Sequence, residues 1–170
     1  LVIGSGVAGL RAAIEAAEHC NVTLLCKGVL SDSNTWNAQG GIASVLDPED
    51  SLESHVSDTL ATGCGLSDEA VVREVVGRGP ELVRQLVNWG AEFDKVDGRI
   101  DVTREGGHSH ARVAHAHGDS TGRGIAECLI RRARELPSLN LLERFFAIDL
   151  ITEENRCLGV IGHQPRTGLQ

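Results

Sequence analysis

The chain has 170 residues, which is enough for one sizeable hydrophobic core. Its formal net charge of −8 argues against nucleic acid or an anionic membrane surface as the main partner, and aromatic residues, at 3%, are too scarce to form base-stacking platforms. A hydrophobic content of 41% with 20 glycines is typical of a loop-rich α/β protein, and no apolar run reaches the length of a membrane span.

The chain opens on an apolar strand that runs into a G-x-G-x-x-G fingerprint. Gly4 permits the tight turn out of the strand, Gly6 lets backbone N–H groups approach a pyrophosphate, and Gly9 lets the next helix pack closely. The positive end of that helix dipole then faces the anion. The residues predicted to bind the phosphates of a dinucleotide are Gly4, Ser5, Gly6, Val7, Ala8 and Gly9. Because the strand before Gly4 is short and the chain contains no Met, we expect it to be part of a larger protein.

The fingerprint lies in the expected context. An Ala-rich helix over 10–20 and a short apolar strand over 22–26 follow it, which completes a βαβ unit. An NAD-binding unit normally carries an acidic residue about 20 residues after the glycines, but Lys27 ends the second strand here and no acid lies between Glu18 and Asp32. NAD is therefore disfavoured. Lys27 is either a partner for the 2′-phosphate of NADP or a solvated lysine.

The next segment, residues 33–43, has small and amide side chains followed by a Gly-Gly pair. Such a segment offers backbone donors and a close approach to a large flat cofactor, although most Gly-Gly pairs are ordinary turns. The candidate cofactor-binding residues in it are Asn34, Thr35, Trp36, Asn37, Ala38, Gln39, Gly40 and Gly41.

Most of the middle of the chain is predicted to be helical. Ser51 looks like the N-cap of a helix that ends near Thr62, and Ser67 looks like the N-cap of a helix over 68–78. Gly79-Pro80 predicts a break, after which a new helix runs from Pro80 to Trp89. Further elements expected from the pattern are a tight turn at 97–101, a non-periodic loop over 100–120 that is either functional or disordered, a helix over 121–136, and strands over 141–151 and 157–163 joined by a turn at 153–155.

The loop contains a glycine hinge flanked by charged and imidazole side chains, Thr103-Arg104-Glu105-Gly106-Gly107-His108-Ser109-His110. Polar loops on a rigid α/β scaffold commonly carry binding chemistry. A run of four histidines, His108, His110, His115 and His117, matches no standard zinc spacing, so we expect no metal site. The five dispersed cysteines are expected to be reduced, mostly buried thiols in a cytoplasmic protein.

The segments IGSGVAG and SNTWNAQGGIASV together resemble the flavoprotein family of succinate dehydrogenase, fumarate reductase and L-aspartate oxidase. The resemblance implies that both segments bind FAD, the first at the pyrophosphate and the second along the ribityl chain and isoalloxazine ring. A basic residue at the position of Lys27 also fits this family. Several members attach FAD covalently through a histidine in the second segment. This chain has Asn34 before Thr35, and a carboxamide cannot form that bond, so the implied FAD is non-covalent.

The stretch REGGHSH, followed by HAHGDSTGR, is similar to the L-aspartate oxidase branch of the family. This similarity implies oxidation of L-aspartate to iminoaspartate, with oxygen or fumarate as acceptor, as the first step of NAD biosynthesis, with quinolinate synthase as the pathway partner. It also implies that Glu105 orients the substrate, since a carboxylate would pair with the α-ammonium group that succinate lacks. A surface glutamate without a role is the alternative.

The fold class implied is α/β, a Rossmann-like FAD-binding domain with a parallel sheet. Residues 1–170 would form a partial FAD-binding domain, with the capping domain, the proton-transferring arginine and the remaining FAD-binding portion outside the chain. Two alternatives remain. One is a soluble fumarate reductase or succinate dehydrogenase flavoprotein subunit, against which Glu105 and Asn34 argue. The other is an NADP-binding Rossmann module, supported by Lys27 alone.

Overall fold

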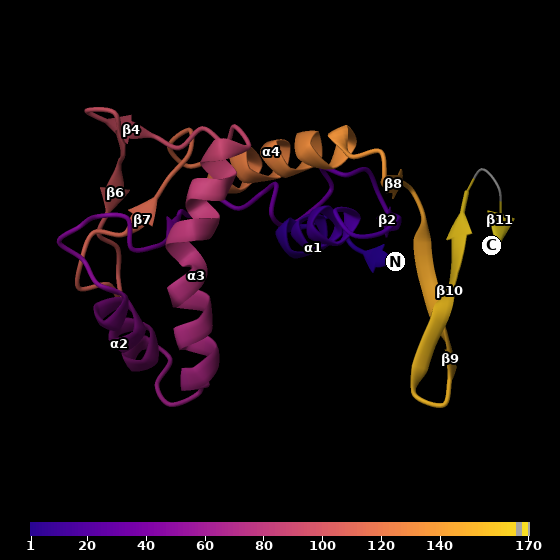
Figure 1. Ribbon diagram of the computed structural model, residues 1–170, viewed down its shortest axis with the longest axis horizontal. Helices are drawn as coiled ribbons and strands as arrows, with labels where there is room; N and C mark the ends of the chain where they lie inside the picture. Colours follow the sequence, from indigo (N-terminus) through magenta and orange to yellow (C-terminus); the bar gives the residue numbers. More distant parts are fainter. Residues whose placement is uncertain (166–167, 170) are drawn as a thin grey trace. The chain divides into compact units, whose positions relative to one another are not determined.

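The computed structural model describes residues 1–165 and 168–169 of the chain (Figure 1). It divides into two compact units, the first formed by residues 1–37 and 125–170 and the second by residues 38–124. No helix in the described part of the chain combines the length and the apolar character needed to cross a membrane.

A parallel sheet with strand order β1-β2-β8 lies at the centre of the first unit, formed by Val2–Ile3, Val22–Leu25 and Leu139–Leu142. Val2 lies opposite Leu24, and Leu24 lies opposite Leu141. Helix α1 (Val7–Ala17) packs against these strands through a buried stripe at helical spacing, Leu10, Ala13, Ile14 and Ala17. The predicted α/β class and βαβ unit are confirmed, with the helix beginning at Val7.

Helix α4 (Thr121–Glu135) contributes residues 125–135 to this unit, in agreement with the helix predicted over 121–136. The predicted single strand over 141–151 is wrong. The chain leaves the parallel sheet after Leu142, Arg144 adopts a φ of 58°, and a new antiparallel strand, β9 (Phe146–Glu153), begins. Strand β9 pairs with β10 (Arg156–Gln164) through the predicted turn, in which Glu154 and Asn155 both have positive φ, and β10 pairs with β11 (Gly168–Leu169).

The second unit contains two helices. Helix α2 (Leu52–Thr62) begins at Ser51, whose hydroxyl accepts a hydrogen bond from the Ser54 N–H at 3.1 Å, so the predicted N-cap is confirmed. Helix α3 (Glu69–Asn88) is capped by Asp68, whose carboxylate accepts from two backbone N–H groups, rather than by Ser67 as predicted. An aspartate at this position is an equally good cap, and the sequence pattern does not separate the two.

The predicted helix break at Gly79-Pro80 is wrong, because α3 continues through both residues. Val76, Val83 and Leu86 are buried on one face that extends across the proline, so packing favours a continuous helix. The glycine at position 79 is explained by packing instead, since a Cβ there would lie 3.1 Å from the Ser44 hydroxyl.

A small antiparallel sheet with strand order β3-β7-β6 completes the second unit, formed by Ile42–Ala43, Val113–Ala114 and Val102–Thr103. Two of its strands lie in the stretch that was expected to be an irregular loop. A separate hairpin, β4 (Lys95–Val96) with β5 (Arg99–Ile100), turns at Asp97 and Gly98, whose φ values of 49° and 80° confirm the predicted tight turn.

Candidate functional site

Two of the three fingerprint glycines, Gly4 and Gly9, are required by the backbone of the first unit. Gly4 has a φ of 110°, which side chains rarely allow. A Cβ at Gly9 would lie 2.0 Å from the carbonyl oxygen of Gly4, so only glycine lets α1 begin this close to the turn. At Gly6, the N-cap of α1, a Cβ would lie 3.4 Å from the Thr35 hydroxyl.

The N-terminus of α1 is suited to an anion. Its N-cap makes no side-chain hydrogen bond, and its first turn contains no acidic residue. The first backbone N–H groups of a helix lack intrahelical partners, and the helix dipole gives this end a partial positive charge. The Val7 N–H donates to the Thr35 hydroxyl at 2.9 Å, which brings the second predicted cofactor segment against the fingerprint. The N-terminus of α1 therefore favours a negative charge beside it.

A cleft of about 480 Å³ in the first unit brings six of the predicted cofactor residues together, namely Gly4, Ser5, Gly6, Lys27, Asn34 and Thr35. Further lining comes from Phe145, Phe146 and Ala147 at the start of β9. Residues from the fingerprint, the end of β2 and the following segment thus share one cavity, with a lysine at its edge and apolar surface beside it. This combination fits a ligand with both phosphate and aromatic parts.

The floor of this cleft is polar and buried. Ser5 is 5% exposed and Cys26 is also buried, with its thiol donating to the Gly28 carbonyl at 3.3 Å. Burial raises the pKa of the Cys26 thiol, so it stays protonated at neutral pH. Lys27, whose side chain is exposed, is the cationic side chain that lines the cleft, and Asp32 is the acidic one.

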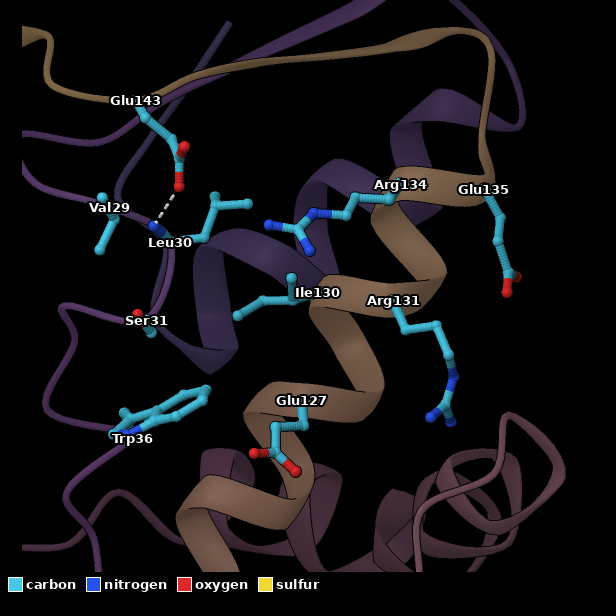
Figure 2. Close-up of a pocket in the computed structure, with 10 residues that line it drawn as sticks. All are labelled: Val29, Leu30, Ser31, Trp36, Glu127, Ile130, Arg131, Arg134, Glu135 and Glu143. Atoms are coloured by element: carbon cyan, nitrogen blue, oxygen red, sulfur yellow. Dashed lines mark hydrogen bonds between the residues drawn. The ribbon is translucent and has the colours of Figure 1, made fainter.

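Trp36 lies elsewhere. Its side chain lines a second cleft, of about 650 Å³, which shares no lining residue with the first (Figure 2). Figure 2 shows Trp36 and Leu30 facing Ile130 and Arg134 of α4, and the Leu30 N–H donates to the Glu143 carboxylate at 2.7 Å. Asn37 is exposed and bonds through its side chain to the Ser33 carbonyl.

The rest of the second cofactor segment, Ala38 to Gly41, belongs to the second unit. The Ala38 carbonyl accepts from the Gly122 N–H at 3.0 Å, and Gln39 and Gly40 are exposed. Gly41 leads into β3 and lies close to β7, because a Cβ there would lie 2.4 Å from a Val113 methyl group and 3.0 Å from the His115 ring. The Gly-Gly pair is thus more than an ordinary turn, since its second member is needed for this strand contact.

Glu105 lies just beyond β6 in an exposed loop. Its carboxylate pairs with His115, Oε1 to Nε2 at 2.9 Å, and the same nitrogen lies 3.2 Å from the Thr103 hydroxyl. The glycine hinge after Glu105 includes Gly107, whose φ is 82° and whose position lies against Thr62 of α2. The side chain predicted to orient a substrate is therefore accessible and lies 2.9 Å from an imidazole nitrogen.

The group that anchors this loop, Arg112, was not predicted from the sequence. Arg112 is fully buried, and its guanidinium donates two bonds to Asp50 at 2.8 Å each and one to Asp58 at 2.6 Å. Asp58 also accepts from the Ser109 backbone N–H at 2.7 Å, which ties the loop to α2. The partners of Arg112 lie 62 and 54 residues away, and no spacing pattern in the sequence links them.

The electrostatics of this anchor follow from its hydrogen bonds. The pKa of Asp58 is lowered to about 2, chiefly by the Ser109 N–H and then by the Ser109 hydroxyl and Arg112. Burial would raise the pKa of Asp50, but hydrogen bonds from Arg112 and the Ser51 N–H outweigh it and lower the pKa. Both carboxylates are therefore ionised at neutral pH.

The other loop histidines have separate surroundings. His110 bonds to the Ser54 and Ser109 hydroxyls, His108 lies 3.4 Å from Arg112, and His117 is exposed with its backbone N–H bonded to Asp94. Among the residues that the structure describes, no three His, Cys, Asp or Glu side chains are grouped to hold a metal ion. Cys26 and Cys128 are buried, whereas Cys20, Cys64 and Cys157 are exposed, so the expectation of mostly buried thiols is wrong.

This chain is similar to known proteins in sequence and in fold. The chain is 47% identical over 155 residues to a chloroplastic L-aspartate oxidase of Arabidopsis thaliana and 46% identical over 160 residues to an L-aspartate oxidase of Vibrio cholerae, each match covering 91% of this chain. It spans 24% and 30% of those relatives' lengths. A quinol fumarate reductase structure from E. coli superimposes with a TM-score of 0.91 at 32% identity, covering 95% of this chain and 28% of that one. Residues 1–170 match the FAD binding domain family, and the chain belongs to that family.

Proposed function

We propose that this chain is part of an L-aspartate oxidase, which oxidises L-aspartate to iminoaspartate. The observation that carries the proposal is the identity of 46–47% to L-aspartate oxidases of a plant and a bacterium over 91% of the chain. An accessible carboxylate at Glu105, in the loop that resembles this branch, supports it. Residues 1–170 would then form part of an FAD-binding domain whose remaining portion and capping domain lie outside this chain.

The FAD would be held without a covalent bond. Gly4 to Gly9 would receive the pyrophosphate at the N-terminus of α1, with Lys27 as the nearby cation in the same cleft. The segment 34–41 would lie along the ribityl chain and ring. Asn34 lines the cleft with a carboxamide, which cannot form a histidyl link to the flavin. The bound flavin would supply the electron-accepting group for the reaction.

Glu105 would recognise the substrate through its α-ammonium group. A carboxylate that accepts a charge-assisted hydrogen bond from an ammonium gains more than one that faces a neutral group. Succinate has the same two carboxylates as aspartate without the cation, so the same glutamate would repel it. One residue would thereby favour an amino acid over a simple dicarboxylate.

The remaining parts of the proposal concern the cellular setting. Oxygen, giving hydrogen peroxide, or fumarate would take the electrons, and iminoaspartate would pass to quinolinate synthase for NAD biosynthesis. We propose a cytoplasmic location for this chain. The V. cholerae relative is named L-aspartate oxidase without a compartment, whereas the Arabidopsis relative is named chloroplastic.

A flavoprotein subunit of fumarate reductase or succinate dehydrogenase is the second candidate, because the E. coli quinol fumarate reductase superimposes so closely. Its identity of 32% is lower than that of the L-aspartate oxidases, and both Glu105 and Asn34 fit it poorly. An NADP-binding module is the third alternative, and only the exposed Lys27 favours it.

The test uses the full-length protein. Its visible spectrum should show oxidised flavin, which an NADP-binding module would lack. Addition of L-aspartate should bleach the flavin and release peroxide in air, whereas succinate should do neither. Bleaching by succinate alone would favour the second candidate, and a colourless protein that binds NADP would favour the third.

A further inference from the structure

Glu105 and His115 come from neighbouring antiparallel strands of the small sheet. Thr103, at the end of β6, lies opposite Val113 of β7, and the Glu105 loop and His115 follow those strands. Gly41 enters β3 on the other side of β7, where Ile42 lies opposite Ala114. The segment proposed to wrap the flavin and the glutamate proposed to bind the substrate therefore leave one sheet, with His115 beside both.

His115 is the better held member of the pair. Its backbone carbonyl accepts from the Asp94 N–H at 2.9 Å, and its ring packs against Gly41, where a Cβ would lie 3.0 Å from Cε1. The His115 side chain is 21% exposed, against 48% for Glu105. Glu105 is followed by two glycines, and its side chain is about half exposed and so is not held by packing. The ring can therefore fix the carboxylate, and not the reverse.

The hydrogen bonds around Nε2 assign its proton. The Thr103 hydroxyl donates to the Val113 carbonyl at 3.4 Å, so it faces Nε2 as an acceptor. An ionised Glu105 can only accept. Nε2 must then carry the hydrogen toward the Thr103 hydroxyl, and Glu105 Oε1 lies 2.9 Å from the same nitrogen. Oε2 of Glu105 has no hydrogen-bond or ion-pair partner among the described residues, which leaves one carboxylate oxygen for an ammonium group.

We infer that His115 is a positioning residue that orients Glu105 toward an ammonium-bearing substrate and so sets the preference for an amino acid over a simple dicarboxylate. This inference rests on the proposed function. His115 does not touch the substrate in this arrangement. It acts by holding Oε1, which stops the glutamate from turning into solvent and keeps Oε2 available.

The experiment compares His115→Gln and His115→Asn in the full-length, flavin-loaded enzyme. A glutamine amide nitrogen reaches about as far as Nε2, whereas an asparagine amide nitrogen reaches only as far as Nδ1. We expect His115→Asn to raise the KM for L-aspartate by about tenfold, the size of a lost hydrogen bond to a charged group, and His115→Gln to restore most of it. Fumarate reduction, whose substrate has no ammonium, should change much less. His19→Asn replaces an exposed imidazole in the other unit and serves as the matched control.

A double-mutant cycle separates positioning from general damage. His115→Asn should add almost nothing in a Glu105→Gln background, because the oriented charge is already gone. Equal losses in both reactions, additive losses in the cycle, or no difference between Gln and Asn would overturn the inference. If Glu105→Gln itself leaves the KM for L-aspartate unchanged, the proposed substrate role of Glu105 fails. If Glu105→Gln raises the KM and His115→Asn does not, only the role of His115 fails.

Discussion

Arg112 and Asp50 form a two-bond ion pair in which both side chains are at most 1% exposed. The exposed pair of Arg73 with Glu53 has the same two-bond geometry, with bonds of 2.8 and 3.1 Å. The two pairs therefore differ mainly in their access to water, which makes them a matched comparison.

Arg112→Met should lower the free energy of unfolding by about 3–5 kcal/mol, because Asp50 and Asp58 would be left without their cation. Arg73→Met should lower it far less, since the exposed pair is screened by water. Urea unfolding of the full-length protein measures both. Equal effects of the two substitutions would mean that burial does not govern the anchor.

Asp58 predicts a stability loss in acid. Its pKa of about 2 in the folded chain lies below the usual 3.8, so its ionised form stabilises the fold above that usual value. The contribution should disappear as the pH falls from 3.8 through about 2. Asp58→Asn should flatten the pH dependence of the unfolding midpoint in this window, whereas Asp101→Asn, at an exposed aspartate, should leave its slope intact. An unaltered slope in Asp58→Asn would refute the assignment.

Gly9→Ala should deprive the purified protein of most of its flavin, because the added methyl would overlap the Gly4 carbonyl and push α1 off the turn. Gly77→Ala provides the control. A Cβ at Gly77, in α3, meets nothing within 4 Å, and the change should stabilise the helix by about 0.5–1 kcal/mol. The ratio of flavin to protein absorbance reports the outcome. Normal flavin content in Gly9→Ala would show that the close contact is unimportant for binding.

Asn34 predicts that the flavin can be removed intact. Acid precipitation of the full-length protein should leave all yellow flavin in the supernatant, and the polypeptide mass should equal that of the sequence. Flavin that stays with the precipitate would contradict the non-covalent assignment and would indicate attachment through another side chain.

Predictions from the sequence were most reliable where a residue type is favoured for a single local backbone conformation, such as a turn or a helix cap. Gly4 and Gly9 of the fingerprint, the Ser51 cap and the Asp97-Gly98 turn are examples, because each satisfies a backbone requirement within a few residues. Gly79-Pro80 shows the limit. The propensity against helix was real, but the buried face shared by Val76 and Val83 outweighed it.

Long-range relationships were out of reach. His115 was visible only as one of four histidines, and its role depends on a pairing between β6 and β7 that no periodicity revealed. The Arg112 anchor is similar, since its aspartates lie on the far side of α3 in the sequence. Such contacts become apparent only when the strands and helices are placed together.

The pairing of Ile42 with Ala114 has a consequence for how such a chain can vary. It brings together the two ends of the long segment between Ile42 and Ala114, which includes α2, α3 and the β4–β5 hairpin. Within that segment, the connection between α2 and α3 contains Leu66, which is 94% exposed, and Cys64 and Gly65, which both have positive φ. Extra residues or a reporter tag inserted at Leu66 would lengthen this segment at an exposed point outside the paired strands β3, β6 and β7. The length of the α2–α3 connection can thus change while Gly41, Glu105 and His115 keep their places in the sequence of paired strands.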